Sequence, residues 1–261
     1  MARFPFLKRA AKPTGDAEKK SSEKAKLRTE RNEYRDIAKK VRQFASFQFI
    51  KGEGIEIGGL HRPLKIFGGA KVRYVDRLST EEVRKYYPNV EGEQQVTVDI
   101  VDDGETLATI ADGSCDFVIA NHMLEHTRNP IATLGNFLRV LRPGGVVYMA
   151  IPDKRFTFDI KRDVTPYEHL KRDYLEGPDW SDREHYEDWA KNVTDPPDAE
   201  TEKQRVEHFI EQKHNIHFHV WTQREIFEFL LNVQRDFGWK FDIEAAIKNG
   251  LELLIVLRKA E

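Results

Sequence analysis

The stretch GIEIGGLHRPL, residues 54–64, decides how the rest of the chain is interpreted. Residues 54–57 form a short β-branched run typical of a strand, which is ended by two glycines and then by a proline. Because Gly58 and Gly59 carry no side chains, backbone N–H groups at this turn can approach a ligand closely. We therefore expect a small-molecule site at this turn, although the two glycines could also serve only to make it tight.

A regular alternation of strands and helices from residue 54 to about residue 151 predicts a parallel sheet. After the strand at 54–57, further strands are expected at 71–76, 95–101, 116–120 and 146–151. The run at 116–120 is apolar almost throughout, which is typical of a strand buried on both faces. Two more strands are expected near the end of the sequence, at 239–246 and 251–258.

Two capping boxes mark the beginnings of helices. Ser79 and Glu82 form the first, and Thr222 and Glu225 form the second. The helix that follows the second box is expected to end at Gly238, because glycine is favoured just beyond a helix C-terminus. The apolar residues expected to pack from this helix are Ile226, Phe227, Leu230 and Leu231.

The clearest helix of the sequence follows Asn129. Asn129 is a favourable N-cap, and Pro130 suits the first helical position because its missing N–H is not needed there. The sequence RPGG at 142–145 is expected to end this helix. Its predicted buried face consists of Ile131, Leu134, Leu138 and Leu141.

Residues 154–220 interrupt the alternation. They are polar, rich in charged and aromatic residues, and contain four prolines. We interpret them as an insertion of short helices and loops that caps the substrate side of a domain at 51–261.

The N-terminal segment differs in charge from the rest of the chain. Residues 1–45 hold 14 Lys and Arg against 6 Asp and Glu, a net charge of +8, so the remainder carries −10. We expect a disordered basic leader at 1–25, either simply solvated or in contact with an anionic surface, and an amphipathic helix at 26–50. The apolar stripe of that helix, which packs on the main domain or pairs with a partner's helix, is Leu27, Tyr34, Ile37, Val41 and Phe44.

Composition excludes several classes of protein. No apolar run of about 18 residues exists, so no membrane span is expected, and residues 1–15 lack the apolar core of a signal peptide. The single cysteine, Cys115, leaves no internal disulfide and fits a reducing compartment. We therefore expect a cytoplasmic protein whose basic arm allows peripheral contact with the inner face of the membrane. The acidic body argues against nucleic acid as a partner.

Asp76, at the end of the second expected strand, strengthens the case for a nucleoside ligand. It lies 18 residues beyond Gly58, close to the roughly 20 residues expected for an acid that binds ribose hydroxyls, although it could instead cap the following helix. Taken alone, this fits NAD, FAD or S-adenosylmethionine. The dinucleotide fingerprint G-x-G-x-x-G fails, because Leu60 and Pro63 stand where glycines are needed. A ligand without phosphates is less demanding at this turn.

Five motifs in one order now define a family resemblance: EIGGLHRP, YVDR, DDGETL, DFVIANHMLEH and LRVLRPGGVVYMAIPD. Together they resemble the class I S-adenosylmethionine-dependent methyltransferases over about residues 50–153 and, more weakly, over the final helix and two strands. The resemblance implies a Rossmann-like, doubly wound, mostly parallel α/β sheet of seven strands whose last strand is antiparallel. It also implies S-adenosyl-L-methionine as cofactor and S-adenosyl-L-homocysteine as product.

The resemblance assigns roles at the first two strands. Glu56, Gly58 and Gly59 would hold the methionine part of the cofactor, and Asp76 would bind the ribose hydroxyls. The glycine loop is E-I-G-G rather than the family's E-x-G-x-G-x-G, and the helix that normally follows it is nearly absent.

The resemblance also assigns roles further along the chain. Asp103 and Gly104 match the acidic turn that meets the adenine, although Asp103 could equally lie in a solvated turn. Asn121 and His122, just past the fourth strand, would sit beside the sulfonium.

A hydroxyl acceptor would need a general base, and the candidates are His122, Asp153, His217 and His219. His217 and His219 alternate with apolar residues, so on an extended segment their side chains point the same way. They could act as base and orienter, bind a divalent metal with a carboxylate, or merely be hydrogen-bonded. Because no third ligand is identifiable, no metal is expected.

Residues 154–220 also offer groups for an acceptor. The cations Lys154, Arg155, Lys161 and Arg162 stand among the aromatic residues Phe156, Phe158, Tyr167, Tyr174, Trp180 and Tyr186. The pattern resembles methyltransferases that accompany glycosyltransferases in surface-polysaccharide synthesis, which implies a sugar, glycan or other small polar acceptor. A catalytically inactive binding module and a nicotinamide-dependent oxidoreductase are the alternatives, and a homodimer is left open.

Overall fold

The computed structural model describes residues 33, 35–59, 62–86 and 96–261. The chain divides into two units, Met1–Lys40 and Val41–Glu261. In the first unit, residues 33 and 35–40 are helical, and Ile37 is 57% exposed. The expected leader at 1–25 lies outside the described residues, as do Leu27 and Tyr34 of the expected apolar stripe.

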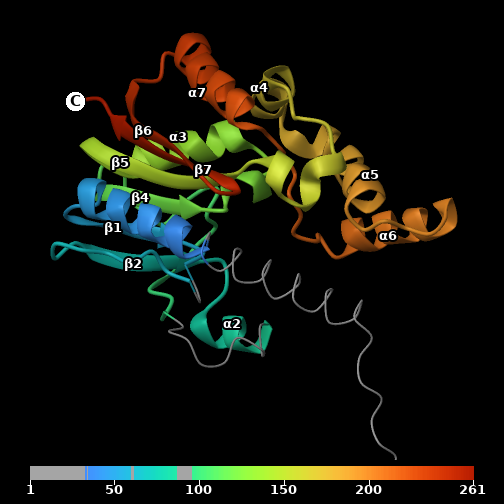
Figure 1. Cartoon of the computed structure of the whole chain (residues 1–261), viewed down its shortest axis with the longest axis horizontal. Coiled ribbons are helices and arrows are strands. Elements are labelled where there is room, and N and C mark those ends of the chain that lie inside the picture. Colours follow the sequence, from blue (N-terminus) through green and yellow to red (C-terminus); the bar gives the residue numbers. More distant parts are fainter. Residues whose placement is uncertain (1–32, 34, 60–61, 87–95) are drawn as a thin grey trace, which may run out of the picture. The chain divides into compact units, whose positions relative to one another are not determined.

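The second unit is built on a seven-stranded sheet with the strand order β3-β2-β1-β4-β5-β7-β6 (Figure 1). β1 to β5 pair in parallel, whereas β7 runs antiparallel to both β5 and β6. The predicted seven-stranded sheet with an antiparallel last strand is therefore confirmed. The strands are β1 Glu53–Ile57, β2 Lys71–Asp76, β3 Ile100–Val101, β4 Cys115–Asn121, β5 Leu141–Pro152, β6 Phe241–Asn249 and β7 Glu252–Lys259.

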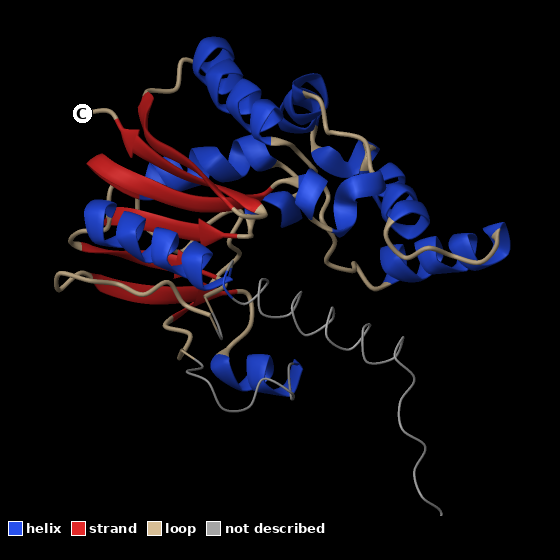
Figure 2. Cartoon of the chain, in the orientation of Figure 1, coloured by secondary structure: helices blue, strands red, loops and turns tan. Residues whose placement is uncertain are grey.

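Helices cover both faces of this sheet (Figure 2). One face packs against α3 and α7, and the other packs against residues 41–50 and the segment around Leu64. Because side chains alternate along a strand, neighbours such as Val147 and Tyr148 enter opposite layers. The helices are α2 Thr80–Tyr86, α3 Pro130–Val140, α4 Tyr167–Glu176, α5 Asp182–Asn192, α6 Ala199–Glu211 and α7 Gln223–Phe237, with single turns at Leu124–His126, Lys154–Phe156, Phe158–Lys161 and Pro178–Trp180.

The predicted helix caps are confirmed. The Asn129 side chain accepts from Ala132 N at 3.0 Å, and Pro130 begins α3. Thr222 and Glu225 form the expected capping box of α7, and Gly238 ends that helix in the left-handed conformation. The box formed by Ser79 and Glu82 precedes α2 in the same way.

Two predicted element boundaries are wrong. β3 is only two residues long rather than spanning 95–101, and the Asp99 carboxylate accepts the Tyr74 N–H at 2.8 Å where a strand would offer a backbone carbonyl. The run RPGG at 142–145 belongs to β5, which begins at Leu141. The register between β4 and β5 shifts there, so these residues form an irregularity within the strand.

Besides Ile37, two apolar residues predicted to pack are exposed. Leu231 on α7 is 56% exposed because the buried face of that helix is formed by Ile226, Phe229, Leu230 and Val233. Phe44 is 64% exposed, since its neighbours Ala45 and Ser46 fill the interface instead. Spacing alone does not separate these positions, because each lies next to a buried residue.

Residues 154–220 carry α4, α5, α6 and three of the single-turn helices. Figure 1 shows α4, α5 and α6 lying beyond the ends of the strands rather than on a face of the sheet. None of the described helices has the length and apolar character needed to cross a membrane.

Candidate active site

The carboxyl ends of β1, β2 and β4 meet at one edge of the sheet because these strands run in parallel. Ligands in open α/β sheets bind at this edge, close to the point where the strand order reverses. Glu56 is the penultimate residue of β1, Asp76 ends β2, and Asn121 ends β4. The structure therefore brings together the strand-end residues expected to bind the cofactor.

The glycine turn after β1 has the geometry that its sequence predicts. Gly58 has a φ of +65°, in the left-handed region that favours glycine, and its N–H donates to Val75 O at 3.0 Å. Gly59 lies against the side chains of Glu56 and Tyr74. The turn is thus tied to β2 and brings its backbone close to the Glu56 carboxylate.

Glu56 is an acid buried at this edge, with 2% of its surface exposed. Its two oxygens accept from Leu64 N at 2.9 and 3.2 Å. Burial raises the pKa of Glu56 to about 7, although the Leu64 N–H and the charge of Arg42 act in the opposite direction. A buried carboxylate with this pKa is suited to receive a cationic group of a ligand.

The two acids assigned to the nucleoside, one at the end of β2 and one in the turn after β3, are partly solvated. Asp76 accepts from Leu78 N at 3.0 Å, and burial raises the pKa of Asp76. Asp103 is exposed and accepts from Glu105 N at 2.7 Å. A Cβ on Gly104 would lie 2.7 Å from Ile57 Cγ2, so only glycine lets the acidic turn approach the end of β1 this closely.

Asn121 and His122 follow β4. Asn121 Oδ1 is buried, and among the described residues it has no hydrogen-bond partner. His122 has a φ of +50°, which costs a non-glycine residue about 1 kcal/mol, and its N–H donates to Ala150 O at 2.8 Å. Strain of this kind is typical of functional sites.

The His122 side chain lies between two carboxylates. Its Nε2 is 2.8 Å from Glu252 Oε2, and its Nδ1 is 3.5 Å from Glu125 Oε1. Burial opposes protonation of His122, but Glu125 and Glu252 outweigh that effect and raise its pKa to about 9. His122 is therefore a cation at neutral pH, which makes it a poor general base.

Glu252 and Arg42 are site residues that the sequence analysis misses. Glu252 begins β7 and accepts from Arg42 Nε at 2.7 Å and from Asn249 Nδ2 at 2.6 Å. Burial alone would raise the pKa of Glu252, whereas Arg42 and His122 lower it. The available signal was an acid inside the otherwise apolar run LELLIVL, because a buried charge needs a partner.

The other three candidate bases lie in different surroundings. Asp153 is bound by Arg155, whose Nε and Nη2 lie 2.9 and 2.5 Å from its oxygens. Burial would raise the pKa of Asp153, but the hydrogen bonds and charge of Arg155 lower it. His219 is fully buried. Neither residue is available to an acceptor in this arrangement.

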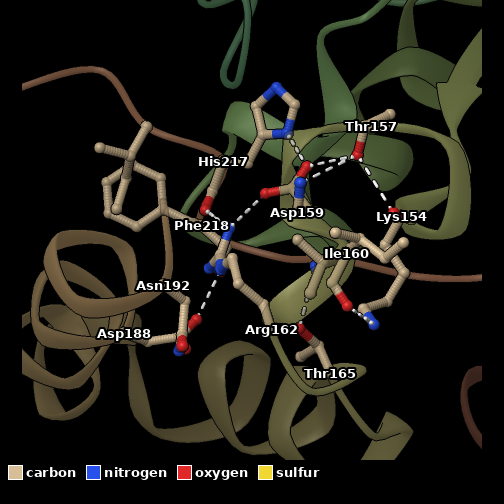
Figure 3. Close-up of polar contacts among 12 residues, drawn as sticks. Lys154, Thr157, Asp159, Ile160, Arg162, Thr165, Asp188, Asn192, His217 and Phe218 are labelled. Carbon is tan, nitrogen blue, oxygen red and sulfur yellow. Dashed lines mark hydrogen bonds and ion pairs between the residues drawn. The ribbon is translucent and has the colours of Figure 1, made fainter. Parts of the chain in front are cut away.

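His217 forms a His–Asp pair with Asp159 (Figure 3). His217 Nδ1 lies 2.8 Å from Asp159 Oδ2, and Asp159 Oδ1 is 2.9 Å from Arg162 Nη1. Burial would raise the pKa of Asp159, but His217 and Arg162 lower it. In Figure 3 the other ring nitrogen of His217 points away from the carboxylate.

This His–Asp pair lies near the cofactor edge. Ring nitrogens of His126 and His217 and a Glu125 oxygen lie within 4.8 Å of one another, and Glu125 also contacts His122. The segment that carries His217 is held there because Phe218 N donates to Glu125 O at 2.8 Å. His217 and His219 thus join different clusters, one on each side of Phe218.

The expectation that four cations face an acceptor needs correction. Arg162 is 2% exposed, and its side chain donates to Asp159, to Asp188 and to the carbonyls of His217 and Phe218. Arg155 is paired with Asp153. The aromatic rings that remain exposed are those of Phe156, Phe158 and Trp180, whereas Tyr186 is buried.

Comparisons with known proteins agree with this geometry. A mostly parallel sheet of this order with helices on both faces is a Rossmann-like, doubly wound fold, and folds of this kind bind ligands at the carboxyl edge. The family model described as "Methyltransferase domain" matches residues 29–227, so the chain belongs to the S-adenosylmethionine-dependent methyltransferase family. A comparison with curated proteins finds no match.

Several solved structures are similar to this chain. A protein from Methanococcus maripaludis, provisionally described as an S-adenosyl-L-methionine-dependent methyltransferase, is 13% identical with 98% of each chain covered and a TM-score of 0.44. A SAM-dependent methyltransferase from Methanosarcina mazei is 17% identical, with 81% of this chain and 93% of that chain covered and a TM-score of 0.41. The assignment itself rests on the family match.

The chain is thus an enzyme of methyl transfer that uses S-adenosyl-L-methionine. The residues at the edge fit this cofactor. The buried Glu56 carboxylate offers a counter-charge for an ammonium, and the buried Asn121 Oδ1, without a partner among the described residues, offers an acceptor.

Proposed function

We propose that this enzyme methylates a hydroxyl of a sugar, glycan or other small polar acceptor, with His217 as the general base. The observation that carries the proposal is the pairing of His217 Nδ1 with Asp159 Oδ2 at 2.8 Å, close to the cofactor edge. A hydroxyl requires removal of its proton during attack, whereas an amine or thiol requires less assistance. An oriented histidine is the group that such a reaction needs.

We infer that the cofactor is held by the residues at the carboxyl edge. Glu56 and the Gly58–Gly59 turn would receive the methionine part, with Asp76 on the ribose hydroxyls. Asp103 and Gly104, which follow β3, would border the adenine, and Asn121, at the end of β4 on the other side of β1, would border the sulfonium. Support comes from their shared edge of the sheet and from the close contact of Gly104 with Ile57.

The other candidate bases are less suitable than His217. His122 is held as a cation by Glu125 and Glu252, and Asp153 is neutralised by Arg155. His219 is fully buried in another cluster. His217 is 8% exposed, has one nitrogen fixed by Asp159, and lies next to Phe158, a residue that is 55% exposed.

The proposed chemistry is an in-line displacement. The bound cofactor supplies a methyl group on a sulfonium, which is already a strong electrophile. As the acceptor oxygen would form its bond to that methyl, the methyl–sulfur bond would break to leave the neutral thioether of S-adenosylhomocysteine, and His217 Nε2 would take the hydroxyl proton. Asp159 keeps Nδ1 protonated and stabilises the imidazolium that forms, as an orienting carboxylate does in other base pairs of this type.

Two exposed aromatic residues of the single turns after β5, of which Phe158 contacts His217, support a polar, ring-shaped acceptor. Phe158 is 55% exposed and packs at 4.8 Å from the His217 ring, and Phe156 is 50% exposed beneath Arg155 and Lys248. Flat apolar faces beside charged hydrogen-bond donors suit a sugar. We therefore place the acceptor among glycans and nucleotide sugars, as in surface-polysaccharide synthesis.

The test follows transfer of a labelled methyl group from S-adenosylmethionine to a panel of nucleotide sugars, glycans and small amines. The proposal predicts labelling of a hydroxyl-bearing sugar, and loss of labelling in His217→Ala with retained binding of S-adenosylhomocysteine. Labelling confined to amines or thiols would contradict it. Equal turnover in His217→Ala and the wild type would remove His217 from the mechanism.

A further inference from the structure

Three histidines and one aspartate meet outside the proposed methyl-transfer site. His169 and Asp173 lie one turn apart on α4, His185 lies on α5, and His219 lies on the extended segment before α7. We call these four residues the His169 cluster. Asp173 and His219 are fully buried, and His185 is 8% exposed, so the cluster is closed to solvent on most sides.

The distances within the His169 cluster are those of ligands around one small ion. His169 Nε2 lies 3.1 Å from His185 Nε2 and 3.4 Å from Asp173 Oδ2, and Asp173 Oδ2 lies 3.7 Å from His219 Nε2. Ligand atoms placed about 2.0–2.1 Å from a tetrahedral zinc ion are separated by about 3.3–3.4 Å. One potential ligand atom from each of the four residues lies within 4.8 Å of all the others.

The three imidazole rings are arranged edge-on around this point. Ring centroids are 4.9 Å apart for His169 and His185, 4.9 Å for His185 and His219, and 5.6 Å for His169 and His219. The interplanar angles range from 64° to 81°. Rings that merely stacked as core side chains would not need to direct their nitrogens toward a common carboxylate.

Two buried polar atoms of the cluster lack partners. Within the described part of the chain, neither Asp173 Oδ2 nor His219 Nδ1 has a hydrogen-bond partner. A buried polar atom without a partner lowers the stability of the fold by roughly 1–3 kcal/mol, so such atoms need an explanation. A bound ion that contacts the atom would provide one. An ion bound at Asp173 Oδ2 would satisfy an oxygen that the surrounding protein leaves unpaired.

We propose that the His169 cluster binds a divalent transition metal ion, with zinc as the favoured ion. Three imidazoles and a carboxylate match the nitrogen and oxygen ligands that zinc takes in four-coordinate sites. Because all four ligands come from the protein and are largely buried, the site is structural rather than catalytic. The ion would fasten α4 and α5 to the segment that carries His219.

The contacts around the cluster fit a metal site. Ser181 Oγ donates to Asp173 Oδ1 at 3.1 Å, which leaves Oδ2 for the ion. Asn129 Nδ2 donates to the Asp173 backbone carbonyl at 2.9 Å, which ties this part of α4 to the residue before α3. Hydrogen bonds of this kind orient metal ligands in proteins.

The second group with metal-binding residues, Glu125, His126 and His217, is a weaker candidate. His217 Nδ1 is committed to Asp159, and His126 Nδ1 is 2.9 Å from Ile216 O. This group has three ligands, of which one is the proposed base. The two groups therefore make different predictions for mutants, and the experiment separates them.

The test measures metal in the full-length chain, produced without a polyhistidine tag and freed of loosely bound ions by gel filtration. The variants are His185→Gln and Asp173→Asn. His208→Gln, which changes an exposed histidine of α6, is the matched control, and His126→Gln tests the second group. We expect about one zinc ion per chain in the wild type, in His208→Gln and in His126→Gln. We expect His185→Gln and Asp173→Asn to lose most of this zinc.

A cobalt titration keeps the test decisive if the two variants fail to fold. Wild-type chain stripped of metal with a chelator is titrated with Co²⁺, and we expect the intense visible absorption of four-coordinate cobalt and a rise in Tm. Absence of Zn²⁺ and Co²⁺ uptake by the stripped, folded chain would overturn the proposal. Retention of zinc by a folded His185→Gln or Asp173→Asn, or its loss in His126→Gln alone, would overturn it as well.

Discussion

At the scale of single residues, the carboxyl edge of the sheet holds two residues whose arrangement lowers the stability of the fold. Glu56 is buried and carries a pKa near 7, and His122 is held in a left-handed backbone conformation. Each feature costs the folded state free energy that an ordinary strand end would not. Both residues lie where the cofactor is proposed to bind, which is where such costs are expected.

Glu56 predicts a specific dependence of stability on pH. Its pKa is raised from 4.5 to about 7, so its contribution to stability is present at low pH and is lost as the pH rises through 7. Because one pKa unit corresponds to about 1.4 kcal/mol, the loss is on the order of 3 kcal/mol. Urea unfolding of the apo-enzyme measures this. The free energy of unfolding of Glu56→Gln should rise relative to that of the wild type between about pH 5 and about pH 8.

The matched control for this prediction is Glu53→Gln, on the same strand but exposed and paired with Lys71. It should leave the pH dependence of unfolding nearly unchanged. A Glu56→Gln variant that follows the wild-type curve at every pH would show that the carboxyl titrates normally. Glu56→Gln should also bind S-adenosylhomocysteine more weakly, because the counter-charge for the ammonium group of the ligand is gone.

The proposed general base, His217, predicts a specific effect on kcat. His217→Ala should lower kcat by roughly 10²–10⁴-fold with little change in cofactor affinity, because only the general base is lost. Asp159→Asn should lower kcat in the same direction and alter its pH profile, because Asp159 orients His217. Steady-state kinetics with a labelled methyl group measures both, and a change confined to KM would argue against a base.

At the scale of elements, helix caps could be predicted from the sequence because they depend on a few neighbouring residues. The boxes at Ser79 and Thr222, and the Asn129–Pro130 pair, are local signals and all three are confirmed. β3 was predicted too long because the Asp99 side chain replaces a ladder hydrogen bond, which depends on the neighbouring strand. The outward position of Leu231 likewise depends on how α7 meets the sheet.

Asn129 should matter more to stability than Thr222, although both cap a helix. Thr222→Ala removes a cap and should cost about 1 kcal/mol. Asn129→Ala removes the cap of α3 and also the hydrogen bond from Nδ2 to the Asp173 carbonyl, which joins α3 to α4. We expect a loss of about 2 kcal/mol in urea unfolding. Equal losses in the two variants would mean that the link to α4 contributes nothing.

At the scale of the whole molecule, the sheet topology and the meeting of Glu56, Asp76 and Asn121 at one edge could be predicted because strand periodicity and the motif order are encoded along the chain. The base and its surroundings could not be assigned in the same way. Arg42 and Glu252 meet from segments 210 residues apart. The four members of the His169 cluster come from three separate segments, so HNIHFHVW alone revealed no third ligand. Contacts of this range are set by the folding of the whole domain and not by local sequence.

The most direct test of the central claim is calorimetric titration of the purified full-length chain with S-adenosylhomocysteine and, separately, with NADH. The account predicts micromolar binding of the first and none of the second. Asp76→Asn, which keeps an acceptor for Leu78 N, should weaken S-adenosylhomocysteine binding by about 2–3 kcal/mol. No binding of S-adenosylhomocysteine by the folded chain, or equal affinity in Asp76→Asn, would contradict a cofactor site at the carboxyl edge of β1, β2 and β4.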